Sequence, residues 1–211
     1  MSEATTASIT VYSDYVCPFC YLGRESLSRY QADREEPLRI DWQPFDLRAG
    51  KRTADGEIDH SVDDGKDDDY FEQAKESVRR LQQEYDVEMT LELATEVDSL
   101  DAQVASAYVS NEHPYETWLA FDEAIFVALW QDGRDIGSED VLVDLATSVG
   151  IDGDEITAAL NDEAHRETVT DAFTAAQQAG ITGVPTFVAD GHAARGAVPP
   201  AQLRRLVEGA E

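Results

Sequence analysis

The two cysteines of this 211-residue chain, Cys17 and Cys20, are separated by two residues and directly follow a strand pattern. Residues 8–16, "SITVYSDYV", are rich in β-branched and aromatic side chains, which is typical of a β-strand. Pro18 then stands at the expected first position of a helix, and apolar residues continue at helical spacing as far as Tyr30. The pattern therefore predicts a C-x-x-C pair at the junction of a strand and a helix.

At that junction the pair is suited to thiol–disulfide chemistry. The unpaired N–H groups and the dipole of a helix N-terminus stabilise an anion, so the thiolate of Cys17 is favoured there. Cys20 lies one turn further along and directs its sulfur into the protein. We therefore expect an exposed attacking thiol and a shielded resolving thiol. In a chain without other cysteines, this spacing indicates a dithiol redox centre.

Two other interpretations of the cysteine pair are weaker. A structural disulfide closing a loop of four residues gains only about 2 kcal/mol in the chain-entropy model, against about 4.7 kcal/mol for a loop of 100 residues. A structural zinc site needs two further ligands. The sequence predicts no metal site, because the four histidines are scattered singly along the chain: His60, His113, His165 and His192.

The rest of the chain reads as one further strand, a block of helices and a hairpin. Residues 38–47 predict a second strand, stopped by Pro44, and residues 48–69 predict a solvated, acidic loop. The segments "PTFVAD" and "AARGAVP" flank an Asp-Gly turn, which predicts a hairpin, and a short helix ends the chain. Helical patterns cover residues 69–87, 100–110, 114–133, 138–150, 152–162 and 163–180.

The charge balance excludes several classes of partner. Forty-four acidic residues face sixteen basic ones, which gives a formal charge of −28. A nucleic acid or an anionic membrane is therefore not an expected partner. The acidic excess runs through every segment and indicates adaptation to molar salt, where a Debye length of about 3 Å screens the repulsion.

The termini and apolar segments predict the location of the protein. The N-terminal "MSEATTAS" has neither the basic nor the apolar region of a secretory signal. The longest apolar stretch, around residues 124–130, is far shorter than the ~20 residues that span a bilayer. We expect a cytoplasmic protein without a membrane span.

The segment "GITGVPTFV" near the C-terminus resembles the cis-proline loop that thioredoxin-fold redox proteins place beside their C-x-x-C pair. More narrowly, "DYVCPFCYLG", "WQPFDL", "GRDIGSEDVLVDLA" and "AAQQAGITGVPTFV" resemble the FrnE-like subfamily of DsbA-type proteins. The resemblance implies an α/β, thioredoxin-like fold with a large all-helical insertion. Residues 1–48 and 163–211 would form a discontinuous thioredoxin-like domain, and residues 49–162 the insertion.

The resemblance implies a thiol–disulfide oxidoreductase that acts on protein disulfides through Cys17 and Cys20 without a cofactor. Pro18 and Phe19 would form the active-site turn. By the same resemblance, two residues near the C-terminus would line the substrate groove: Val184, whose backbone would pair with an extended polypeptide as an added strand, and Pro185. The electron donor would be a low-molecular-weight thiol or a thioredoxin-type protein. The sequence leaves a monomer and a homodimer open.

The Pro-aromatic dipeptide between the cysteines bears on the reduction potential. It resembles the corresponding pair of glutaredoxins, for which about −200 to −230 mV is typical. We therefore expect a moderate redox couple that is not strongly oxidising.

Two alternative functions share this scaffold. The neighbouring 2-hydroxychromene-2-carboxylate isomerases and kappa-class glutathione transferases typically carry a serine at the position of Cys17 and act with glutathione. A small-molecule isomerase or thiol transferase that uses Cys17 with a low-molecular-weight thiol is therefore the first alternative. A non-catalytic, chaperone-like binder that uses the helical insertion is the second.

Overall fold

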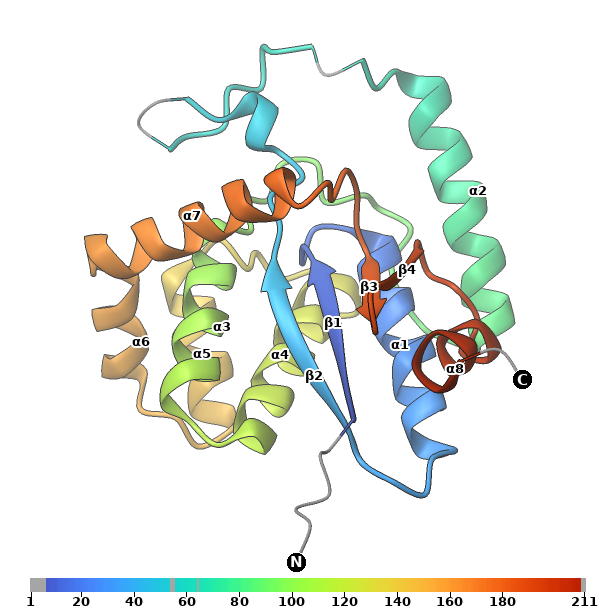
Figure 1. Ribbon diagram of the computed structural model, residues 1–211. Coiled ribbons are helices and arrows are strands. Elements are labelled where there is room, and N and C mark those ends of the chain that lie inside the picture. Colours follow the sequence, from blue (N-terminus) through green and yellow to red (C-terminus); the bar gives the residue numbers. More distant parts are fainter. Residues whose placement is uncertain (1–6, 54–55, 64, 210–211) are drawn as a thin grey trace, which may run out of the picture.

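The computed structural model describes residues 7–53, 56–63 and 65–209 (Figure 1). The outer ends of the expected thioredoxin-like domain, at residues 1–6 and 210–211, and parts of the acidic segment therefore lie outside the described residues. The division of the chain at residues 49 and 162 stays a prediction.

A four-stranded sheet with the order β2-β1-β3-β4 forms the centre of the structure. β2 (Leu38–Pro44) runs parallel to β1 (Ala7–Ser13), whereas β3 (Thr186–Ala189) runs antiparallel to β1, and β4 (His192–Arg195) runs antiparallel to β3. The predicted hairpin is confirmed, because Asp190 and Gly191 both have positive φ angles, of 48° and 78°.

The helices follow the predicted order. α1 (Pro18–Ala32) packs against α8 (Pro200–Glu208), and α8 also contacts β1, β3 and β4. α7 (Glu163–Gln178) packs against β2 and α3. The remaining helices are α2 (Asp68–Tyr85), α3 (Leu100–Glu112), α4 (Tyr115–Trp130), α5 (Glu139–Ser148) and α6 (Gly153–Leu160), with a 3-10 turn η1 (Ala49–Lys51) after β2.

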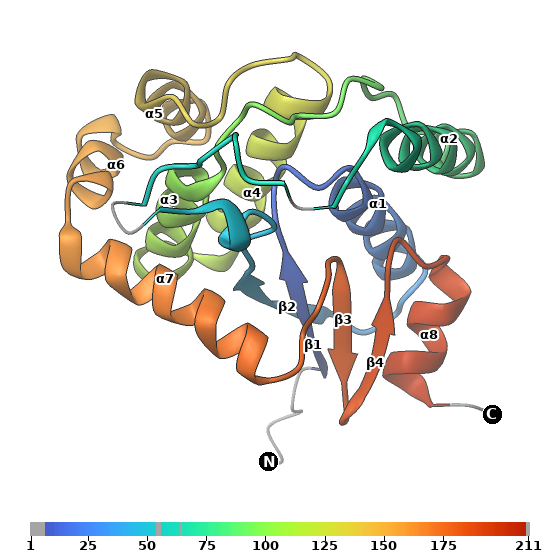
Figure 2. The ribbon, with the colours of Figure 1, turned by 90° about the horizontal axis from the view of Figure 1, so that it is seen from above.

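The helices lie on two sides of the sheet. Figure 2 shows α3, α4, α5, α6 and α7 on the β2 side of the molecule, with α5 and α6 outermost, and α2 and α8 on the other side. α2 packs on α1, where Val78 and Tyr85 form a small core with Leu22 of α1. No helix among the described residues is both long and apolar enough to cross a membrane.

α4 supports the segment that leads from β1 into α1. The ring of Phe126 lies 4.7 Å from that of Tyr15 and 5.8 Å from that of Tyr21, measured between ring centroids. Trp130 donates from its indole Nε1 to the carbonyl oxygen of Tyr15 at 2.8 Å. The residues that flank the cysteine pair are therefore packed against the helical block as well as against the sheet.

Candidate active site

The cysteine pair opens α1, as the sequence predicts. Cys17 is the N-cap residue and has extended backbone angles, with φ −91° and ψ 114°, and Pro18 occupies the start of the helix. The amide of Cys20 donates to the carbonyl oxygen of Cys17 at 3.0 Å, so the two residues form one helical turn. Both cysteines are unlinked thiols.

The prediction that the attacking thiol, Cys17, is exposed is wrong. Cys17 is only 4% exposed, hardly more than Cys20 at 2%. Cys17 lies in the lining of a cleft of about 890 Å³, together with Pro18, Phe19 and Val184, and the segments that form the cleft cover most of its surface. Because Cys20 is not among the lining residues, the asymmetry between the two thiols persists as access through the cleft and not as surface exposure.

The cis-proline loop lies directly beside Cys17. The peptide bond between Val184 and Pro185 is cis, and Cys17 Sγ donates to the carbonyl oxygen of Val184 at 3.5 Å. The hydroxyl of Thr186 donates to the carbonyl oxygen of Gly183 at 2.7 Å and closes the loop at the start of β3. The structure thus places Cys17, Pro18, Phe19 and Val184 around one cleft, whereas Pro185, the next residue after Val184, is not part of its lining.

The other wall of the cleft comes from a part of the chain that the sequence did not associate with the site. The segment between β2 and α2 was expected to be a solvated loop, but it forms η1 and a β-bridge between Arg52 and Ile58. It lines the cleft together with the first turn of α2 and the segment 93–96. The apolar residues Ile58, Tyr70 and Phe71 within an acidic stretch were the available sequence signal.

Ionisation of the Cys20 thiol is disfavoured at its position behind Cys17. Burial raises the pKa of the Cys20 thiol well above its usual range, and a hydrogen bond with Cys17 and the charge on Cys17 act in the same direction. In the dithiol form of the protein, Cys20 is therefore protonated and a weak nucleophile.

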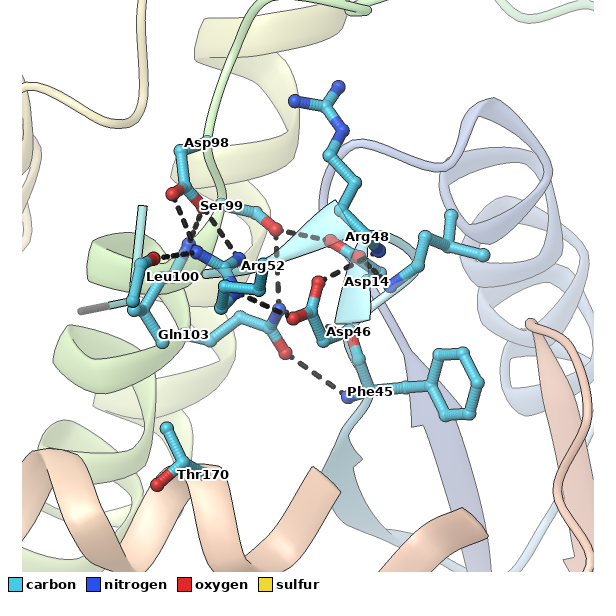
Figure 3. A network of polar contacts seen from close by, with 12 residues as sticks. Asp14, Phe45, Asp46, Arg48, Arg52, Asp98, Ser99, Leu100, Gln103 and Thr170 are labelled. Carbon is cyan, nitrogen blue, oxygen red and sulfur yellow. Dashed lines mark hydrogen bonds and ion pairs between the residues drawn. The ribbon is translucent and has the colours of Figure 1, made fainter. Parts of the chain in front are cut away.

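A buried carboxyl group that was not among the predicted site residues lies next to the cysteine turn. Asp14 has no exposed surface and accepts hydrogen bonds from Ser99 Oγ at 2.6 Å, Leu47 N at 2.9 Å and Val16 N at 3.2 Å (Figure 3). Burial raises its pKa from 3.8 to about 6, although Ser99 and the two backbone amides act against that increase. The sequence signal was a carboxylate placed directly after an apolar strand.

Further ion pairs hold the cleft wall near Asp14. Arg52 bonds Asp46 at 2.8 Å and Asp98 at 2.8 Å, and it thereby connects the segment after β2 to the start of α3 (Figure 3). The guanidinium of Arg48 donates to the backbone carbonyls of Ala94 and Val97. These contacts fix the position of the wall through residues far apart in the sequence.

The described histidines do not assemble a metal site. His113 Nε2 lies 3.0 Å from a carboxylate oxygen of Glu155, and His165 Nε2 lies 3.0 Å from the carbonyl oxygen of Val104. Within residues 7–53, 56–63 and 65–209, no three His, Cys, Asp or Glu side chains are grouped so that they could hold an ion.

Residues 8–208 match the family described as the DSBA-like thioredoxin domain. The Bacillus subtilis (strain 168) protein YwbO, described as uncharacterized, is 29% identical over 184 residues, which are 87% of this chain and 86% of that protein.

Three solved structures share the fold. A probable DsbA oxidoreductase from Streptomyces coelicolor has a TM-score of 0.75 at 22% identity and covers 97% of this chain and 91% of its own. A 2-hydroxychromene-2-carboxylate isomerase has a TM-score of 0.72 at 21% identity, with coverages of 90% and 89%. The cytosolic disulfide reductase DsbM from Pseudomonas aeruginosa, solved with GSH, has a TM-score of 0.61 at 17% identity, with coverages of 96% and 93%.

Proposed function

The chain belongs to the DsbA-like thioredoxin-domain family, whose α/β fold with a helical insertion it has, and on that premise we propose that it is a thiol–disulfide oxidoreductase acting through Cys17 and Cys20. The observation that carries the proposal is the position of the Cys17 sulfur, at the base of a cleft and 3.5 Å from the Val184 carbonyl oxygen. Cys20 lies one turn behind it in the same helix.

In the reducing direction the reaction has two exchange steps. The Cys17 thiolate attacks one sulfur of a substrate disulfide, a bond forms between Cys17 and that sulfur, and the second substrate sulfur leaves as a thiolate. Cys20 then loses its proton and attacks Cys17, which releases the first substrate sulfur and forms the Cys17–Cys20 disulfide. A low-molecular-weight thiol or a thioredoxin-type protein returns two electrons and regenerates the dithiol.

The high pKa of the Cys20 thiol fits its place as the second nucleophile. Burial and the charge on Cys17 both disfavour the Cys20 thiolate in the reduced protein. Once Cys17 is bound in a mixed disulfide, its negative charge is gone and no longer disfavours the Cys20 thiolate. The resolving step is therefore favoured only after a substrate has been attached.

The substrates we propose are disulfides that reach Cys17 through the cleft. An extended segment of a polypeptide substrate would lie along Val184 and Pro185, with the Val184 backbone as its pairing edge. We further propose that the protein works in the reducing environment of the cytoplasm, where its disulfide form would be transient. In that setting the reductive direction is the expected one.

A second candidate function is favoured by the shape of the site. Cys17 is 4% exposed and lies in the lining of a partly open cleft, which fits a small molecule as well as a narrow polypeptide segment. A small-molecule isomerase or thiol transferase would use Cys17 together with a low-molecular-weight thiol. Such an enzyme would not need Cys20, and this requirement separates the two candidates.

The deciding experiment compares the wild type with Cys17→Ser and Cys20→Ser in two assays. One assay is multiple-turnover reduction of insulin, and the other is reduction of bis(2-hydroxyethyl) disulfide, both with dithiothreitol as the reductant. The proposed function predicts turnover by the wild type and its loss in both variants. Full activity of Cys17→Ser would overturn the proposal. Retained activity of Cys20→Ser on the small disulfide alone would favour the thiol transferase.

A further inference from the structure

Asp14 lies three residues before Cys17, and its carboxyl group connects three segments that form the site. Its Oδ1 accepts from Ser99 Oγ and Val16 N, and its Oδ2 accepts from Leu47 N. Val16 belongs to the turn that carries Cys17, Leu47 lines the cleft, and Ser99 directly precedes α3. Figure 3 shows this carboxyl group between Ser99 and the backbone that follows β2.

The same turn is tied to Cys17 through the backbone of Asp14. The amide of Cys17 donates to the Asp14 carbonyl oxygen at 3.1 Å, while the Asp14 side chain holds the amide of Val16 in between. The side chain of Asp14 therefore links the turn that carries Cys17 directly to the cleft wall at Leu47.

We propose that Asp14 is a positioning residue for thiol–disulfide exchange at Cys17 and that it acts in its ionised form. The inference rests on the proposed function, because exchange at Cys17 is the reaction that Asp14 would serve. Asp14 touches neither a substrate nor, through its carboxyl group, the reacting sulfur. It sets the turn and the wall between which a disulfide must approach.

The requirement for the ionised form follows from counting donors and acceptors. A carboxylate has acceptor sites on both oxygens, so it serves all three donors at once. Protonation of Oδ1 or Oδ2 places a hydrogen on the oxygen that accepts from Val16 N or from Leu47 N, so one of these two amides loses all or part of its hydrogen bond. A buried backbone amide without a partner costs about 1–3 kcal/mol, so either the turn or the wall must shift.

Burial and the charged groups around Asp14 set the pH at which its carboxyl group changes protonation state. Two charged groups come from the segment after β2: the carboxylate of Asp46 repels that of Asp14, whereas the guanidinium of Arg48 attracts it. From the side of α3, Asp98 is held in an ion pair with Arg52. On the side of α1, the groups are the thiols of Cys17 and Cys20. Burial is the largest influence, and it raises the pKa of Asp14 to about 6. The transition therefore falls in a range where exchange rates can be measured.

The first test is the pH profile of bis(2-hydroxyethyl) disulfide reduction by the wild type between pH 5 and 8. Each rate is divided by the thiolate fraction of Cys17, which is measured separately from absorbance at 240 nm. We expect a second step near pH 6, with a loss of roughly tenfold to a hundredfold on the acid side, because misplacement of reacting groups by about 1 Å can cost about a hundredfold in rate. A corrected rate that is flat with pH overturns the inference.

Three variants sharpen the test. Asp14→Asn has an acceptor and a donor in place of two acceptors, so it should show the low plateau at every pH. Ser99→Ala removes one hydrogen bond that lowers the pKa of Asp14, so the step should move to higher pH. As the control, Asp144→Asn removes an exposed carboxylate that pairs with Arg134 and does not line the cleft, and it should keep the wild-type step.

The possible results separate the inference from the proposed function. Absence of turnover by the wild type at every pH would contradict the proposed function itself. Turnover with no step, or with a step that Asp14→Asn leaves intact, would overturn only the role of Asp14. If Asp14→Asn does not fold, the wild-type step and its displacement in Ser99→Ala still decide the question, and an unmoved midpoint would reject the inference.

Discussion

The Sγ atom of Cys17 lies 3.5 Å from the carbonyl oxygen of Val184, although 167 positions separate the two residues in the sequence. Cys17 is held by the turn that leaves β1, and Val184 is held by the loop that enters β3, the strand next to β1. The central sheet therefore brings together the two halves of the site. Changes that alter the packing of α1 on β3 should alter this contact.

Gly23 of α1 lies against the cis-proline loop and the start of β3. A Cβ atom at this position would meet Pro185 Cγ at 3.0 Å and the Phe187 ring at 3.1 Å. Phe187 is fully buried and the proline ring is stiff, so neither neighbour can move away easily. We expect Gly23→Ala to lower the free energy of unfolding by about 1–2 kcal/mol, since overpacking costs ~1–3 kcal/mol and the gain in helix propensity returns at most ~1 kcal/mol.

Chemical denaturation measures this change, with Gly50→Ala as the matched control. A Cβ atom on Gly50 would meet nothing within 4 Å, so that variant should unfold at nearly the wild-type denaturant concentration. A Gly23→Ala variant as stable as Gly50→Ala would show that α1 and β3 are less tightly packed than this geometry requires.

The buried carboxyl group of Asp14 makes a specific contribution to the pH dependence of stability. Its pKa is raised in the folded protein, from 3.8 to about 6, so the folded state binds this proton more tightly than the unfolded state. The stabilisation is complete below about pH 4 and is lost as the pH rises through about 6. A shift of about two pH units corresponds to about 3 kcal/mol.

Asp14→Asn isolates that contribution, because the asparagine does not titrate in this range while the other carboxylates remain. The free energy of unfolding of the wild type, minus that of the variant, should fall between pH 4 and pH 7. The loss of hydrogen bonds in the variant adds a constant offset that does not affect the slope. A difference that is independent of pH would mean that Asp14 has an ordinary pKa in the folded state.

The acidic composition leads to a prediction about salt. With 44 acidic and 16 basic residues, the folded chain concentrates negative charge that the unfolded chain spreads out. Dilution from 1 M to 0.1 M salt lengthens the Debye length from about 3 Å to about 10 Å. We expect the midpoint of thermal unfolding to fall on dilution in potassium chloride. A midpoint that is constant or rises would contradict adaptation to molar salt.

The local features of the site could be predicted because they depend on neighbouring residues. Cys17 at the N-cap, Pro18 at the helix start and the Asp190–Gly191 turn all follow from short-range backbone preferences, and the structure has each of them. The order of strands and helices also followed from periodicity and from the family resemblance, and the strand–helix–strand start and the final hairpin are confirmed.

The errors concern contacts between distant segments. The burial of Cys17 depends on where the segment between β2 and α2 crosses the site, and no local pattern specifies that path. The role of Asp14 was missed for a related reason. Its partners Leu47 and Ser99 lie 33 and 85 positions away, and only the folded structure brings them to one carboxyl group.

The order of action of the two sulfurs is tested most directly by trapping mixed disulfides. Cys17 lines the cleft, whereas Cys20 does not, and burial keeps the Cys20 thiol protonated. Cys20→Ser should therefore attack disulfides and fail to release them, while Cys17→Ser has no thiol that a substrate can reach. The measurement is the amount of each variant found in mixed disulfides with other proteins on a non-reducing gel, with the partners identified by mass spectrometry. Abundant adducts with Cys20→Ser and almost none with Cys17→Ser are predicted, and equal trapping by the two variants would contradict the assignment of Cys17 as the attacking thiol.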